Sequence, residues 1–295
     1  MIKKNIIVVT GGAGFVGSNL INLLLRKTSY KIVSIDDYSS GSKKNHIKSS
    51  RVKYLKSHTK NISSILKKPK KINAIFHFGE FARIYQSFIE MDKCLSSNSI
   101  GTNAVFNFCL INKVKLIYSA TSASLGNQGK DKNLSPYAFT KSKNLELLEN
   151  LKKWFNFKYE IVYFYNVYGP RQISRGSMAT VIGIFEECYK TNKPLTVVKP
   201  GNQSRRFTHI DDTVDVCFKA WKKNLCRHYS ISNKESYTIL EVAKLFGKKI
   251  KYLPKRAGER YASALTNMNL SNKVYKYFGK KKLKDYIKKF IKINN

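Results

Sequence analysis

The feature that most constrains the fold of this chain is a glycine-rich turn near its N-terminus. Gly11, Gly14 and Gly17 lie between a β-branched run at 5–10 and a segment at 19–26 whose apolar residues have helical spacing. Glycines at such a turn let the backbone approach a pyrophosphate, and the N-terminus of the following helix offers free amide groups to it. The pattern predicts a strand, a phosphate-binding turn and a helix. The alternative is the same local structure without a ligand.

A second apolar run, 31–35, follows this helix and ends at Asp36, nineteen residues beyond Gly17. An acid at the end of the second strand accepts the ribose hydroxyls of a dinucleotide and repels a 2′-phosphate, so the sequence favours NAD over NADP. Lys43 and Lys44 lie close by and weaken that preference. The expected cofactor-binding residues of this region are Gly11, Gly14, Phe15, Val16, Gly17, Asp36 and Asp37.

Strand-like segments recur along the first half of the chain and alternate with segments of helical patterning. This alternation predicts an α/β fold, a doubly wound parallel sheet of the Rossmann type. We expect an NAD-binding domain over 1–164, rejoined by a segment near 208–233, and a smaller C-terminal α/β domain over 165–295 that binds the substrate. The further strand-like segments are 52–55, 74–78, 114–118 and 159–164.

The net charge is unusual for an enzyme, because 55 Lys and Arg residues stand against 18 Asp and Glu residues, giving +37. A polyanionic partner such as nucleic acid would explain this excess. A general compositional bias explains it better, since the lysines are spread along the chain and only the 280–292 tail is dense. We therefore expect no nucleic-acid partner.

The cysteines and the hydropathy of the chain indicate the cellular compartment. The five cysteines include no CxxC pair, which predicts neither a metal site nor a disulfide framework. The apolar run at 6–9 is too short for a signal peptide, and no stretch approaches the ~20 apolar residues of a membrane helix. We expect a cytoplasmic protein without a membrane span.

A possible catalytic group follows the strand at 114–118. Thr121 is followed sixteen residues later by Tyr137, and Lys141 stands four residues beyond Tyr137, on the same face of a helix. A phenol is a weak base at neutral pH because its ordinary pKa is ~10, but a neighbouring ammonium favours the phenolate. Tyr137 is the expected general base. A lone YxxxK pattern is common and by itself indicates little. Its position after a dinucleotide-binding motif favours the catalytic interpretation.

At these residues the chain resembles the extended short-chain dehydrogenase/reductase family, and within it the nucleotide-sugar epimerases and dehydratases that are similar to UDP-glucose 4-epimerase. The resemblance covers nearly the whole chain, and the motifs stand in the order of the family. These motifs are TGGAGFVGSNL (10–20), NSIGT (98–102), SPYAFTK (135–141), YNVYGPR (165–171), RRFTHIDD (205–212) and RAGE (256–259).

The resemblance implies a role for each matching residue. Thr121 would bind the 4-hydroxyl of the sugar, Tyr137 would remove its proton, and Lys141 would also hold the nicotinamide ribose. The residues implied as ligands of a diphosphate, which is expected to belong to a UDP-linked sugar, are Asn166, Arg205 and Arg256. A solvated basic face is the alternative for the two arginines. For His77 and His209, a packed or hydrogen-bonded histidine is the preferred interpretation.

The chain also departs from the family pattern. Glu80 stands where the family usually has an alanine, which places a carboxylate near the expected cofactor pyrophosphate. The acid that usually meets adenine is replaced by the 56–59 segment, which contains His58. Leu125, before Gly126, stands where a tyrosine is usual. These differences affect the expected NAD contacts and leave Thr121 and Tyr137 in place.

The resemblance also narrows the reaction. A 4,6-dehydratase of the family carries an acidic pair directly after the Ser/Thr, whereas this chain has Ser122 and Ala123. The remaining outcome is C4 epimerisation through a transient 4-keto sugar, with NAD regenerated in each cycle. The alternatives are a 4-reductase, a dehydratase, an epimerase acting at another carbon, and a catalytically silent relative that binds nucleotides or nucleic acid.

Two further expectations rest on the resemblance. The segments 92–111 and 137–154 correspond to helices that pack as a four-helix bundle between two subunits, so a homodimer is expected. Ser263, seven residues after Arg256, corresponds to the residue beside the C2 substituent of the sugar. A serine there leaves room for an N-acetyl group, and Tyr261 could occupy the same place if the loop is shifted.

Overall fold

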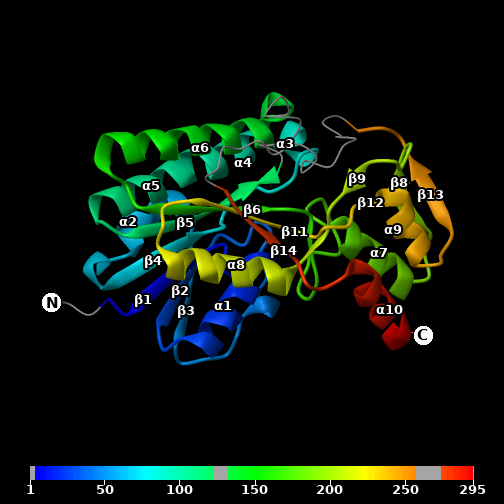
Figure 1. Ribbon diagram of the computed structural model, residues 1–295, viewed down its shortest axis with the longest axis horizontal. Coiled ribbons are helices and arrows are strands. Elements are labelled where there is room, and N and C mark those ends of the chain that lie inside the picture. The colour runs from blue at the N-terminus through cyan, green and yellow to red at the C-terminus, as the bar shows by residue number, and fades with distance from the viewer. Residues whose placement is uncertain (1–3, 123–131, 257–273, 295) are drawn as a thin grey trace.

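The computed structural model describes residues 4–122, 132–256 and 274–294. Its centre is an eight-stranded parallel sheet in the order β14-β11-β6-β5-β4-β1-β2-β3 (Figure 1). The run from β3 to β6 has the strand order of a dinucleotide-binding fold, and the order reverses between β1 and β4. The strands are β1 Ile6–Thr10, β2 Lys31–Asp36, β3 Val52–Lys56, β4 Ile72–His77, β5 Lys115–Thr121, β6 Tyr159–Phe164, β11 His228–Ser232 and β14 Val274–Phe278.

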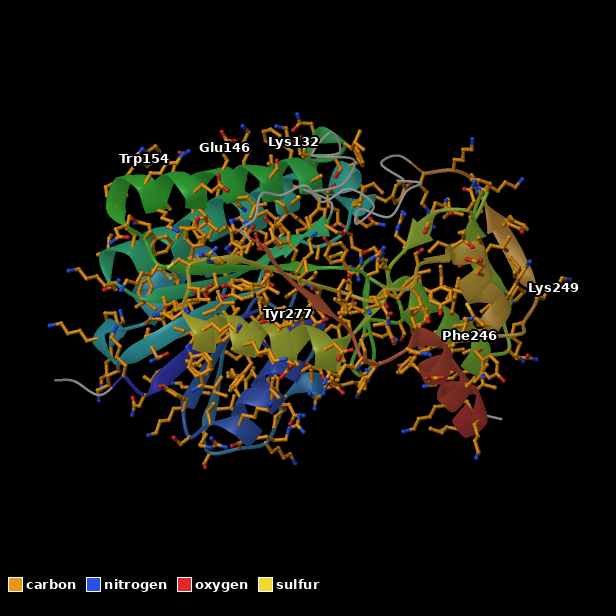
Figure 2. The ribbon with its side chains drawn as sticks, viewed as in Figure 1. Lys132, Glu146, Trp154, Phe246, Lys249 and Tyr277 are labelled. Atoms are coloured by element: carbon orange, nitrogen blue, oxygen red, sulfur yellow. The ribbon has the colours of Figure 1, made fainter. Side chains whose placement is uncertain are left out.

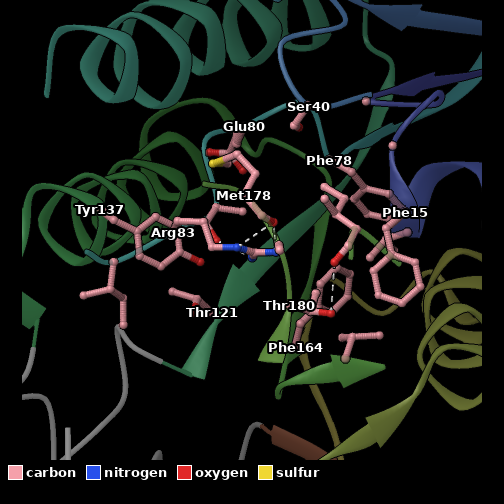
Figure 3. Close-up of a pocket in the computed structure, with 18 of the residues that line it drawn as sticks. Phe15, Ser40, Phe78, Glu80, Arg83, Thr121, Tyr137, Phe164, Met178 and Thr180 are labelled. Carbon is pink, nitrogen blue, oxygen red and sulfur yellow. Dashed lines mark hydrogen bonds between the residues drawn. The ribbon is translucent and has the colours of Figure 1, made fainter. Parts of the chain in front are cut away.

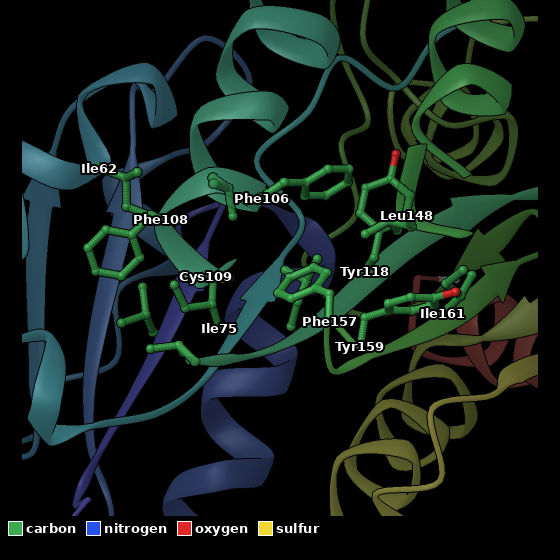
Figure 4. Close-up of a cluster of buried hydrophobic side chains, with 14 of the residues drawn as sticks. Ile62, Ile75, Phe106, Phe108, Cys109, Tyr118, Leu148, Phe157, Tyr159 and Ile161 are labelled. Carbon is green, nitrogen blue, oxygen red and sulfur yellow. The ribbon is translucent and has the colours of Figure 1, made fainter. Parts of the chain in front are cut away.

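Helices cover both faces of this sheet, which is why the central strands are continuous apolar runs (Figure 1). On one face, α1 (Phe15–Lys27) and α8 (Ile210–Lys223) bury Leu20, Leu24 and Cys217 against β1 and β4. On the other face lie α2 (Ile62–Ile65), α5 (Thr102–Ile111) and α6 (Pro136–Phe155). Their buried cluster, drawn in Figure 4, includes Phe106, Cys109, Leu148, Ile75 and Tyr118.

The rest of the chain forms a smaller layered unit beside the sheet (Figure 1). Its core contains Phe185, Val197 and Phe246, and Leu283 and Ile287 of the last helix close it. Its strands pair as β8 (Leu195–Val198) with β13 (Ile250–Leu253), β9 (Ser204–Arg205) with β12 (Tyr237–Thr238), and β7 (Val167–Tyr168) with β10 (Thr208–His209). Its helices are α7 Val181–Lys190, α9 Ile239–Leu245 and α10 Leu283–Asn294.

The expected α/β fold with a doubly wound parallel sheet is confirmed. The structure adds two features to it. First, β14 pairs with β11 at the edge of the large sheet, although its residues lie inside the segment that we assigned to the smaller domain. Second, the helical segment at 92–111 consists of α4 (Met91–Leu95), a π-helical stretch η4 (Ser96–Gly101) and α5. It is preceded by the short helix α3 (Gln86–Ile89).

Charged side chains project all round the outline of the molecule (Figure 2). Lys132, for example, lies at the top of this view and Lys249 at its right end. Among the described residues, no helix is long and apolar enough to cross a membrane.

Candidate active site

A cleft of about 530 Å³ lies where the carboxyl ends of the sheet strands meet the smaller unit. The glycine turn after β1, Asp36 at the end of β2 and Thr121 at the end of β5 all line it. Arg205 of β9 and Arg256 line it from the smaller unit. Parallel strands place their carboxyl ends at one edge of a sheet, and a reversal in strand order opens a crevice there. The sequence motifs therefore meet although they are far apart in the chain.

The glycine turn has the geometry that a pyrophosphate site needs. Gly11 has a φ of +67°, and a Cβ atom there would lie 2.8 Å from the backbone of Phe78 and Gly79. A Cβ atom on Gly17 would lie 2.1 Å from the carbonyl oxygen of Gly11. Gly14 caps α1 without a side chain, so the amides of Phe15 and the residues after it face an open approach. These residues fit the phosphates of a dinucleotide.

The two acids after β2 differ in their surroundings. Asp36 is buried, and its carboxylate accepts hydrogen bonds from the backbone N–H groups of Ala13 and Tyr38, both at 2.9 Å. Burial raises the pKa of Asp36 above its ordinary value. Asp37 accepts from the N–H and the hydroxyl of Ser39 at 2.9 and 2.7 Å. Each Asp36 oxygen retains a lone pair for a ribose hydroxyl, so this end of the cleft also fits NAD.

Tyr137 and Lys141 lie in the first turns of α6. Ser135 begins this helix by accepting a hydrogen bond from the N–H of Ala138 at 3.1 Å, and Pro136 occupies the first helical position. Both Tyr137 and Lys141 are at least 90% buried and line the cleft. Figure 3 shows Thr121 and Tyr137 in the same part of the cleft. The predicted catalytic residues are therefore brought together.

Glu80, which departs from the family pattern, forms a buried ion pair with Lys141. The Lys141 ammonium also donates to the carbonyl oxygen of Ser119 at 2.6 Å and lies 4.7 Å from the ring centre of Tyr118. The Glu80 carboxylate accepts further hydrogen bonds from the hydroxyls of Thr102 and Tyr118, both at 3.0 Å. Glu80 thus balances the charge of Lys141 and fixes the position of its ammonium.

His77 is fully buried at the end of β4 and belongs to the same network. The Thr10 hydroxyl accepts two backbone N–H groups, so it donates its proton to Nδ1 of His77 at 2.7 Å. The Nε2–H of His77 then donates to the Thr102 hydroxyl at 3.0 Å, and Thr102 donates to Glu80. Burial lowers the pKa of His77 to about 4. A neutral ring with its proton on Nε2 gives each of these groups a hydrogen-bond partner. His77 is therefore a buried, hydrogen-bonded histidine, which is the interpretation preferred from the sequence.

Arg83 lines the cleft, and the sequence motifs gave no signal for it. Its Nε and Nη2 donate to the carbonyl oxygen of Met178, and its Nη1 donates to that of Ala82. In Figure 3 the Tyr137 hydroxyl points toward the Arg83 side chain. Arg83 therefore adds a fixed cation to the catalytic end of the cleft.

The residues assigned to the diphosphate lie in the cleft wall as well. Asn166 adopts a φ of 38° and donates from Nδ2 to the carbonyl oxygen of Arg206 at 3.1 Å. Arg205 donates to the carbonyl oxygen of Ser204 at 2.8 Å. The Arg256 guanidinium lies 5.3 Å from the ring centre of Tyr85. Asn166, Arg205 and Arg256 all line the cleft. Ser263 lies outside the described residues.

The two remaining histidines of interest cap helices. His58 lines the cleft and accepts from the N–H of Lys60 at 3.1 Å, and burial lowers its pKa. His209 caps α8 by accepting from the N–H of Asp211 at 3.2 Å, and burial lowers its pKa as well. Within the described ranges, no group of three or more His, Cys, Asp or Glu side chains is placed to hold a metal ion.

The doubly wound sheet, the glycine turn at its reversal and the Thr121, Tyr137 and Lys141 group define a dinucleotide-dependent enzyme of the extended short-chain dehydrogenase/reductase type. Residues 7–232 match the model of the NAD dependent epimerase/dehydratase family. The chain belongs to this family, whose members depend on NAD, and the expected resemblance and cofactor are confirmed.

Individual relatives act on different nucleotide sugars. ADP-L-glycero-D-manno-heptose-6-epimerase of Brachyspira hyodysenteriae is 28% identical over 98% of this chain and 94% of its own. UDP-N-acetylglucosamine 4-epimerase of Methanobrevibacter ruminantium, solved with UDP-N-acetylmuramic acid, superposes with a TM-score of 0.85 at 24% identity, over 99% of this chain and 98% of its own. UDP-glucuronic acid 4-epimerase of Bacillus cereus, solved with UDP-glucuronic acid and NAD, has a TM-score of 0.81 at 26% identity, over 98% of this chain and 100% of its own.

Proposed function

We propose that this enzyme interconverts the C4 epimers of a UDP-linked hexose. One observation carries the proposal: Thr121, Tyr137 and Lys141 meet at one end of the cleft, and no described residue places a free carboxylate beside them. Among the described residues, the acids that line the cleft are Asp36, Asp37 and Glu80. The first two belong to the glycine-turn end, and Glu80 is paired with Lys141. An arrangement without a free acid suits proton and hydride movement at one carbon better than elimination of water.

The residues act in a defined order. Thr121 orients the 4-hydroxyl of the sugar, and Tyr137 accepts its proton as general base. Bound NAD supplies a reversible hydride acceptor for the carbon at this position. Asn166, Arg205 and Arg256 hold the diphosphate, for which the guanidinium fork is suited, while the keto sugar turns to present its other face. Tyr137 then returns the proton.

The proposal predicts turnover without added reductant. The protein is incubated with UDP-glucose, UDP-N-acetylglucosamine and UDP-glucuronate in turn, and the C4 epimers are resolved by chromatography. Tyr137→Phe should lower kcat by ~10²–10⁴-fold, because it removes the proton acceptor. Tyr252→Phe, at an exposed tyrosine of β13, is the matched control and should keep the wild-type rate. Wild-type activity in Tyr137→Phe, or no C4 epimer from any of the three sugars, would contradict the proposal.

A further inference from the structure

Arg83 is held rigidly between the two parts of the molecule. It lies just before α3, and its Nε and Nη2 donate to the carbonyl oxygen of Met178, which precedes α7, at 2.9 and 2.5 Å. Its Nη1 donates to the carbonyl oxygen of Ala82 at 2.8 Å. Three of the five guanidinium N–H donors are thereby used, and the other two have no hydrogen-bond partner among the described residues. Both fixed contacts are with neutral carbonyl groups.

The positive charge of Arg83 has no counter-charge in the described part of the chain, where no carboxylate lies within 4.0 Å of it. Lys141, another cation that lines the cleft, is neutralised by Glu80. Arg83 is half-buried, and this burial lowers the pKa of its guanidinium, which remains protonated at neutral pH. A partly desolvated cation without a counter-charge is costly, and an anionic ligand would offset that cost.

The position of Arg83 indicates which part of a ligand it would meet. The Tyr137 hydroxyl points toward the Arg83 side chain, and Thr121 lies in the same part of the cleft (Figure 3). In the proposed reaction these two residues bind the 4-hydroxyl of the sugar. Carbon 6 of a hexopyranose is joined to carbon 5, which is bonded to carbon 4. A group on carbon 6 therefore lies within reach of a side chain beside Tyr137.

We propose that Arg83 binds a carboxylate at C6 of the sugar, so that the substrate is a nucleotide-linked hexuronic acid. The two remaining N–H donors of Arg83 match the two oxygens of a carboxylate. This inference rests on the proposed function for the placement of the sugar. It differs from the diphosphate binding that is assigned to Arg205 and Arg256, although Arg256 lies over the ring of Tyr85, two residues from Arg83.

Binding measurements test Arg83 independently of turnover. The NAD-loaded wild type is titrated calorimetrically with UDP-glucuronate, UDP-glucose and UDP, and the titrations are repeated with Arg83→Met and Arg83→Lys. The wild type should bind UDP-glucuronate most tightly. Arg83→Met should raise the Kd for UDP-glucuronate roughly 10- to 100-fold, which is the range expected when a hydrogen bond to a charged group is lost. The Kd for UDP-glucose and for UDP should change less than about threefold. Arg83→Lys, which keeps the charge, should retain part of the preference.

Several results would overturn this assignment. If Arg83→Met lost equal affinity for UDP and for UDP-glucuronate, Arg83 would instead bind the diphosphate. If it lost equal affinity for UDP-glucose and UDP-glucuronate, Arg83 would not recognise the carboxylate. No preference for UDP-glucuronate in the wild type, or binding of none of the three ligands, would also refute it. If Arg83→Met fails to fold, as judged by its thermal transition, the proposal is tested by the affinities of Arg83→Lys and by the preference of the wild type for UDP-glucuronate over UDP-glucose. Selective binding of UDP-glucuronate without epimerisation would refute the proposed reaction and leave the Arg83 assignment intact.

Discussion

At the scale of single residues, Glu80 is the side chain on which the geometry around Lys141 depends most. Removing it leaves a buried ammonium without a counter-charge, and breaking a buried ion pair typically costs about 3–5 kcal/mol. We expect Glu80→Ala to lose about this much free energy of unfolding in urea. Glu146→Ala on the outer face of α6 removes the exposed partner of Lys143 and should change the free energy of unfolding far less, because water already solvates both charges (Figure 2). Equal losses in the two variants would contradict the role of Glu80.

His77 gives the protein a predictable response to acid. Its pKa falls from the ordinary 6.5 to about 4 on folding, because the ring is buried. Its contribution to stability is complete above pH 6.5 and is lost as the pH falls toward 4, since the unfolded chain then binds a proton that the folded chain does not. The loss amounts to at most about 3 kcal/mol. In His77→Gln, urea unfolding at pH 7 and pH 4.5 should show a smaller difference than in the wild type. An unchanged difference would show that His77 does not carry this dependence.

The sequence predicted the residues whose roles depend on local geometry. Gly11 and Gly17 could be identified because the turn they form lies between adjacent elements, and Tyr137 and Lys141 because a four-residue spacing places them on one helix face. Arg83 could not be identified, since its fixed position depends on a carbonyl group 95 residues away. Glu80 was recognised as unusual, but its partner Lys141 lies 61 residues along the chain and only the fold brings them together.

At the scale of elements, the N-terminus of α6 couples helix stability to catalysis. Ser135→Ala removes the cap and should cost ~1 kcal/mol. Because Tyr137 lies in the first turn of this helix, kcat should also fall several-fold. Thr238→Ala removes the capping box of α9 at a similar expected cost and should leave kcat unchanged. Thermal unfolding and initial rates of both variants test this, and an equal effect of the two on kcat would contradict it.

Element prediction succeeded where burial makes the pattern strong. The inner strands β1 and β4 are covered on both faces, so their apolar runs are easily recognised. β6 contains the buried Glu160 but keeps an apolar run from Ile161 to Phe164. The edge strand β14 is half-exposed and mixes tyrosines with a lysine, which gives no comparable run. The π-helical stretch η4 is not encoded by spacing alone, because Asn98 there exchanges hydrogen bonds with the distant backbone of Phe81.

At the scale of the whole molecule, we propose that α4, η4, α5 and α6 form the interface of a homodimer. Large apolar side chains on these elements are exposed, and they include Met91, Ile100, Ile111, Phe139 and Trp154. Light scattering should give about twice the 33.9 kDa of one chain. The charge of +37 opposes association, so the dimer fraction should rise with salt.

A substitution pair tests whether this surface is the interface. Ile100→Asp combined with Phe139→Asp places charges on it and should shift the protein to monomer at micromolar concentration. Tyr252→Asp on β13, at the far end of the molecule, should leave the mass unchanged. A dimer that persists in the double variant, or a wild type that is monomeric at 0.5 M salt, which is about three times the physiological level, would refute the assignment.

The most direct test of C4 epimerisation follows a hydrogen isotope. The UDP-sugar of the panel that is converted fastest is prepared with deuterium at C4 and incubated with the NAD-loaded protein in ordinary water. Because the hydride leaves C4 and returns to the same carbon, the epimer should retain its deuterium at C4. The unlabelled sugar turned over in D2O should likewise gain no deuterium at C5, as read by NMR and mass spectrometry. Loss of the C4 label to solvent, or exchange at another carbon, would contradict the account.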